Sequence, residues 1–159
     1  MADYETQDHE AEKRPGDLIC EPDADILADW YHQHRVAEGK FIRIGGIVLM
    51  GPGFPDPLSH EPLKHFDIAY AAFHIADETL RSRVIAASEE SRAEAVLRDD
   101  GRNVVDAGHY SCTIGEQGVL AALEVWGESS DLGRADEVGR QKTIDIFQGK
   151  LGSSIPVSE

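Results

Sequence analysis

Residues 106–112 read Asp-Ala-Gly-His-Tyr-Ser-Cys, and this stretch carries most of the information about the fold. Tyr110 and Cys112 are two residues apart, so on a β-strand their side chains point to the same face. Asp106 and Gly108 suit a tight corner before such a strand, because aspartate bonds nearby backbone and glycine tolerates unusual dihedral angles. The stretch therefore predicts a corner followed by a strand whose Tyr110 and Cys112 face a core.

Two residues far upstream complete a pattern with this stretch. Cys20 is the only other cysteine in the chain, and Trp30 follows it, which gives the order Cys…Trp…Asp-x-Gly-x-Tyr-x-Cys. This order resembles the core signature of a V/I-set-like domain of the immunoglobulin superfamily. The resemblance covers residues 13–127 and implies an all-β fold, an immunoglobulin-like two-sheet Greek-key sandwich.

The resemblance also implies a role for each residue of the pattern. Cys20 and Cys112 would form a disulfide bond between the two sheets, and Trp30 would pack against that bond. Tyr110 would form a tyrosine corner, with its ring buried and its hydroxyl group bonded to backbone a few residues upstream.

Asp106 and Gly108 belong to the structural core in the same interpretation. In many members of the family this aspartate pairs with an arginine at the start of strand D, and Arg81 and Arg83 are both candidates. Residues 51–57 contain three prolines and predict an irregular loop rather than a strand.

A mainly helical fold is the competing hypothesis. Leu63, Phe66, Tyr70 and Phe73 recur at steps of three and four residues, as in an amphipathic helix. The same segment also alternates in twos, as in a strand, so its periodicity leaves both interpretations open. In a helical fold the two cysteines would be small buried residues.

The two ends of the chain differ in composition from its centre. Residues 1–12 are acidic and nearly devoid of apolar side chains, which predicts a flexible arm. Residues 128–159 have apolar residues at roughly helical spacing, broken by two glycines. We expect a solvated, partly helical C-terminal extension there, with a helix packed on the sandwich, a stalk or a self-association element as the alternatives.

The charge of the chain restricts the class of partner. Thirty acidic residues against 15 basic ones give a formal net charge of −15, which argues against binding to nucleic acid. No apolar run is long enough to span a membrane. The acidic start does not look like a signal peptide, but an inter-sheet disulfide requires an oxidising compartment, so we expect a secreted chain whose leader has been removed.

No arrangement of residues predicts catalysis, a metal site or a cofactor. The segment 60–65 reads His-Glu-Pro-Leu-Lys-His and superficially resembles the zinc motif His-Glu-x-x-His, but it has one residue too many. Histidines five apart on a helix point to different faces and could not share a metal ion. No glycine-rich phosphate-binding motif occurs either.

We therefore predict an extracellular module that binds another protein without catalysis, as a homo- or hetero-oligomer. The candidate contact residues alternate away from the core positions and are Tyr31, Gln33, His109 and Ser111. Two alternatives use the same observations: a viral or phage structural assembly module with an immunoglobulin-like fold, and an intracellular, acidic, α-rich interaction protein.

Overall fold

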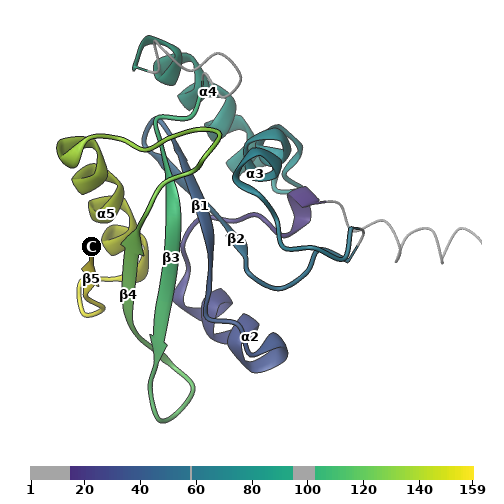
Figure 1. Cartoon of the computed structure of the whole chain (residues 1–159), viewed down its shortest axis with the longest axis vertical. Coiled ribbons are helices and arrows are strands. Elements are labelled where there is room, and N and C mark those ends of the chain that lie inside the picture. The colour runs from purple at the N-terminus through teal and green to yellow at the C-terminus, as the bar shows by residue number, and fades with distance from the viewer. Residues whose placement is uncertain (1–14, 58, 95–102) are drawn as a thin grey trace, which may run out of the picture.

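The computed structural model describes residues 15–57, 59–94 and 103–159, which form both helices and strands (Figure 1). In chain order the elements are η1 (Pro15–Asp17), α2 (Ala24–His34), β1 (Glu38–Ile44), β2 (Ile47–Pro52), α3 (His65–Ala71), η2 (Ala72–His74), α4 (Glu78–Glu94), β3 (Asp106–Ile114), β4 (Leu120–Trp126), α5 (Glu137–Leu151) and β5 (Val157–Ser158).

All of these strands belong to one sheet with the order β2-β1-β3-β4-β5. The pairs β1–β2, β1–β3 and β3–β4 are antiparallel, and the short β5 runs parallel to β4. The glycine pair at 45–46 joins β1 to β2, as suits a hairpin turn. Helices α3 and α4 lie between β2 and β3 in the chain. This connection passes over β1, because β3 pairs with the other edge of β1.

Helices α3 and α4 cover the first face of the sheet. Ile42 of β1 and Leu49 of β2 belong to one core cluster with Ile68 of α3 and Val84 of α4. Helix α3 buries Ile68 and Ala71 against this face, whereas Phe66 and Tyr70, which recur at the helical spacing seen in the sequence, are exposed.

Helices α2 and α5 cover the second face. Phe41 and Met50 point to this side and share a cluster with Leu27 of α2 and Phe147 of α5. The rings of Phe41 and Phe147 meet edge to face, with their centroids 5.5 Å apart. Figure 1 shows α5 and α3 on opposite sides of the strands, so the molecule has three layers with the sheet in the middle.

Strand β2 is buried along its whole length because helices pack against both of its faces. The residues from Ile47 to Met50 are all apolar and all buried. A continuous apolar run is typical of a strand that is covered on both sides, whereas alternation is typical of one that is covered on one side.

The predicted all-β immunoglobulin-like sandwich is therefore wrong, because the chain has one sheet and helices on both faces. Trp30 lies on α2 and not on a strand C. Asp23 caps this helix, since its carboxylate accepts hydrogen bonds from the backbone amides of Asp25 (2.9 Å) and Ile26 (3.1 Å). The tryptophan of the Cys…Trp pattern therefore lies on a helix, whereas the immunoglobulin resemblance implied a strand.

The predicted disulfide bond is also wrong, and Cys20 and Cys112 are both free thiols. Cys20 pairs with Met50 at the β2 edge of the sheet, whereas Cys112 lies on β3, on the other side of β2 and β1. Cys20 and Cys112 are thus three strand spacings of about 4.8 Å apart across the sheet, which is roughly 14 Å. A disulfide needs Cα atoms within about 7 Å of each other.

The C-terminal segment is part of the core rather than a solvated extension. Arg140, Phe147 and Leu151 of α5 are buried, and β5 lies beside β4. The predicted acidic arm, residues 1–12, falls outside the described residues. Within the described ranges, the structure has no helix of the length and apolar character that a membrane span requires.

Candidate functional site

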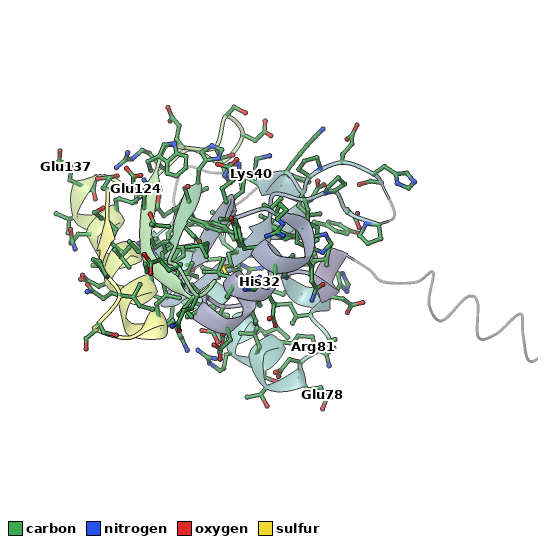
Figure 2. All side chains as sticks on the ribbon, turned by 90° about the horizontal axis from the view of Figure 1, so that it is seen from below. His32, Lys40, Glu78, Arg81, Glu124 and Glu137 are labelled. Atoms are coloured by element: carbon green, nitrogen blue, oxygen red, sulfur yellow. The ribbon has the colours of Figure 1, made fainter. Side chains whose placement is uncertain are left out.

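No helix of the described residues covers the part of the first face that β3 and β4 form. Helices α3 and α4 pack on β1 and β2, while the neighbouring strands β3 and β4 keep exposed and half-buried side chains on the same face. We call this surface the open face; its members are Glu38, Lys40, His109, Ser111, Glu124 and Trp126. Figure 2 shows two of them, Lys40 and Glu124, on the same upper side of the molecule.

The register of three strands arranges the open face in two adjacent rows. In one row Lys40 of β1 pairs with His109 of β3, which pairs with Trp126 of β4. Residues paired in this way stand side by side on the same face of a sheet. Trp126 is 39% exposed, which is uncommon for so large an apolar side chain.

The second row is polar and consists of Glu38, Ser111 and Glu124. Both carboxylates are exposed, and neither has an ion pair among the residues that the structure describes. Lys40 donates a hydrogen bond of 3.2 Å from its Nζ to the carbonyl oxygen of Leu63, which leaves its other two N–H groups for a ligand.

A hollow of about 220 Å³ opens beside the first row. The loop that follows β2 forms one wall, and the strands form the other. Its lining residues are Glu38, Gly39, Lys40, Pro52, Gly53, Pro62, Leu63, His109, Tyr110 and Trp126. A second hollow of about 260 Å³ lies on the other side of Glu38 and includes Arg35 and Ser111.

Two histidines and Trp126 form a chain of rings along the first row. The centroids of His65 and His109 are 5.2 Å apart with the rings nearly perpendicular, and His109 stacks on Trp126 at 5.8 Å. His65 is the first residue of α3, and its Nε2 bonds the carbonyl oxygen of Gly108 at 2.6 Å. That bond fixes the start of α3 to β3.

Both imidazoles are neutral at pH 7. Burial lowers the pKa of His65 below its usual 6.5, and the hydrogen bond to Gly108 only partly opposes this effect. Burial also lowers the pKa of His109, and the positive charge of Lys40 lowers it further. A hydrogen bond to the backbone of Glu128 opposes this shift, and the neutral ring keeps one nitrogen that can accept a hydrogen bond.

The four predicted contact residues do not lie together. His109 and Ser111 belong to the open face, whereas Tyr31 and Gln33 lie on α2, which packs on the opposite face of the sheet. Residues two apart share a face on a strand, but on a helix they are rotated by about 200°. The alternation that relates His109 to Ser111 therefore does not relate Tyr31 to Gln33.

Tyr110 spans the sheet on its second face. Its hydroxyl group donates a hydrogen bond of 2.8 Å to the carbonyl oxygen of Gly51 in β2, and its ring passes over Gly39 of β1. A Cβ atom at Gly39 would lie 2.6 Å from the hydroxyl oxygen of Tyr110, so only glycine leaves room for the ring. The bonding partner of Tyr110 is thus on a distant strand, not a few residues upstream.

Asp106 and Gly108 serve a buried ion pair at the start of β3. Asp106 binds Arg140 of α5 at 2.8 Å and 3.0 Å, rather than Arg81 or Arg83. A Cβ atom at Gly108 would lie 2.6 Å from the backbone oxygen of Trp126 on β4 and 3.0 Å from the guanidinium group of Arg140. Gly108 is needed for this close approach and stands within β3 rather than in a corner.

Trp30 is half-buried and, like both cysteines, packs against the core cluster of the second face.

Five side chains of the open face and of the chain of rings are not among the predicted contact residues: Glu38, Lys40, His65, Glu124 and Trp126. Trp126 and Lys40 join His109 only through strand pairing over 17 and 69 residues of chain, respectively, which no local pattern reveals. His65 was considered for a metal motif with His60. Its only local signal is its place just before an apolar helical spacing, where it starts α3.

In residues 15–57, 59–94 and 103–159, no three His, Cys, Asp or Glu side chains lie in positions that could hold a metal ion. Burial raises the pKa of both thiols to about 12, so they are poor nucleophiles. No protein-family model, curated protein or solved structure matches the chain, so we argue the function from this geometry.

Proposed function

We propose that the chain is a non-catalytic protein-binding module and that the open face is its contact surface. The observation that carries the proposal is the exposed Trp126, stacked on His109 beside a hollow on a sheet face that α3 and α4 leave uncovered. Tryptophan is over-represented among the residues that dominate binding energy at protein interfaces. A half-buried tryptophan held by its neighbours needs little ordering when it binds.

The charge of the chain favours a basic partner. The formal net charge is −15, and the open face carries two carboxylates against one ammonium group. Long-range attraction between opposite charges speeds association and is weakened by salt. Glu38 and Glu124 stand at the exposed edge of the site, where a lysine or arginine of the partner would reach them.

The proposal does not depend on an oxidising compartment. The expectation of a secreted protein was based on the disulfide between Cys20 and Cys112, and the free thiols remove that reason. Binding through the open face relies on Trp126 and on the charges around it, which need no disulfide bond.

The test is an affinity capture with matched variants, followed by a measured Kd for each captured protein. Trp126→Ser removes the ring, and Glu124→Lys reverses one charge of the second row. Val138→Ser on α5, where Val138 is 69% exposed, is the control that removes an apolar side chain elsewhere. Hydrogen exchange of the complex then locates the protected strands.

A partner of the open face should bind Trp126→Ser about 30-fold more weakly, the effect of losing about 2 kcal/mol at an interface hot spot. Glu124→Lys should weaken binding and reduce its dependence on salt, because one charge pair is reversed. Val138→Ser should bind as the wild type does. Equal binding by Trp126→Ser and the wild type, or protection confined to α5, would refute the proposal.

A further inference from the structure

The hollow beside Trp126 is lined by cyclic side chains from two segments, and this inference about its occupant rests on the proposed function. Pro52 and Pro62 line it from β2 and the loop that follows, and His109 and Trp126, stacked at 5.8 Å, line it from the strands. Lys40 also lines it, and its Nζ donates a hydrogen bond to the carbonyl oxygen of Leu63. Aromatic side chains favour contact with another aromatic ring.

The size of the hollow fits one six-membered aromatic ring with a substituent. Its volume is about 220 Å³. A cavity of about 150 Å³ in another protein holds a benzene molecule. The hollow is open to solvent on one side, so a side chain can enter from the surface of a partner.

The charges at the hollow favour a neutral occupant. Lys40 places a positive charge there, which is felt by both histidines. Glu38 places a negative charge at the rim, close enough to act on His109. A lysine or arginine would be repelled by Lys40, and a carboxylate would be repelled by Glu38 and by the net charge of the chain.

The polar groups at the hollow favour an occupant with one hydroxyl group. Lys40 has two N–H groups that are not used by Leu63, and the carboxylate of Glu38 accepts hydrogen bonds. A phenol hydroxyl can accept from the first and donate to the second.

We infer that the hollow receives the phenol ring of a tyrosine side chain on the partner protein. The basic residues of that partner then lie around the tyrosine and meet Glu38 and Glu124. Tyrosine is among the side chains most enriched at interface hot spots, because it has a rigid ring and a polar end.

Two kinds of probe test the inference without the partner. The first is p-cresol, compared with toluene, which lacks the hydroxyl group, and with cyclohexanol, which lacks the aromatic ring. The second is the peptide Ac-Lys-Tyr-Lys-NH2, compared with Ac-Lys-Phe-Lys-NH2. Amide shifts in ¹H–¹⁵N NMR spectra report both the affinity and the place of binding.

We expect p-cresol to shift the amides of Lys40, Gly53 and Trp126 in a saturable way, with toluene about tenfold weaker and cyclohexanol weaker still. The tyrosine peptide should bind more tightly than p-cresol, and the phenylalanine peptide more weakly than the tyrosine peptide. Lys40→Met should reduce the affinity for p-cresol about tenfold and leave toluene binding nearly unchanged. Glu38→Gln provides a second variant at the rim, and Lys142→Met on α5 is the matched control.

Several outcomes would overturn the inference: no saturable shift with p-cresol, equal affinity for p-cresol and toluene, or a tyrosine peptide that binds no more tightly than p-cresol. The last result would mean that the hollow accepts a free phenol and not a side chain of a partner. Failure of the proposed function has a different signature, namely a captured partner whose Kd is unchanged by Trp126→Ser.

Discussion

Replacing Arg140 by methionine should lower the free energy of unfolding by about 3 kcal/mol. Arg140 is 1% exposed and donates two hydrogen bonds to Asp106, at 2.8 Å and 3.0 Å. It also donates to the carbonyl oxygens of Ala107 (3.1 Å) and Gly127 (2.8 Å). Methionine keeps most of the side-chain volume and removes all of these bonds.

The magnitude follows from what remains around Asp106. Removing one partner of a buried ion pair typically costs about 3–5 kcal/mol. After the substitution Asp106 still accepts bonds from Thr143 at 2.6 Å and from the amides of Ala107 and Ala135, both at 2.9 Å. We therefore expect the lower end of that range, which for a chain of this size corresponds to a fall in Tm of about 6–12 °C.

Urea denaturation followed by circular dichroism measures this change, with Arg81→Met as the control. The side chain of Arg81 is 37% exposed and pairs with Glu78, which is 86% exposed, so its loss should cost less than about 1 kcal/mol. An Arg140→Met variant that is destabilised no more than Arg81→Met would refute the argument that the buried ion pair holds α5 to β3.

Acid provides a second readout of the same pair. Burial opposes ionisation of Asp106, but the hydrogen bonds from Arg140 and Thr143 outweigh it and hold its pKa below the usual 3.8. The stability that this carboxylate contributes is present above pH 3.8 and is lost as the pH falls through the lower pKa of the folded state. In Arg140→Met the pKa of Asp106 in the folded state should rise towards the usual 3.8 or above it, so this acid-dependent loss of stability should be smaller than in the wild type.

Three further predictions follow from the sheet and its thiols. Alkylation under denaturing, non-reducing conditions should add two labels. Alkylation of the folded protein should be slow at pH 8, because both thiols have a pKa of about 12. A denatured chain that takes up no label would show that Cys20 and Cys112 are joined by a disulfide after all. Gly39→Ala should lower the free energy of unfolding by more than about 2 kcal/mol, because its Cβ would meet the hydroxyl group of Tyr110. Gly149→Ala, in α5 with no atom within 4 Å of the new Cβ, should raise it by up to about 1 kcal/mol. Urea denaturation measures both changes. Because His65 and His109 have lowered pKa values, the folded state binds fewer protons at these two sites than the unfolded state. Their contribution to the free energy of unfolding should therefore be constant above pH 6.5 and should decrease below it. A flat profile of the free energy of unfolding from pH 7 to 5 would contradict this.

The features that could be predicted from the sequence are local ones. The alternation at 106–112 describes a strand in which Tyr110 is buried and Ser111 is not, and β3 contains that strand. A helix, α3, does follow Leu63, but it buries Ile68 and Ala71, whereas Phe66 and Tyr70 of the predicted apolar spacing are exposed. Such patterns are visible because they depend on the period of one element, which neighbouring residues determine.

The candidate site was only half visible for the same reason. His109 could be named because it alternates with Tyr110 along one strand. Lys40 and Trp126 could not be associated with it, because they reach it through the pairing of three strands.

What the sequence by itself determined is the acidic net charge, the buried strand around residues 106–112 and the apolar run from Ile47 to Met50. What only the tertiary structure decided is which residues these segments meet. The partner of Asp106 is Arg140, which lies outside residues 13–127, to which the resemblance extended. A short motif specifies residue types and spacings along the chain, whereas the number of sheets, the strand register and the pairing of buried charges depend on contacts between segments far apart in sequence.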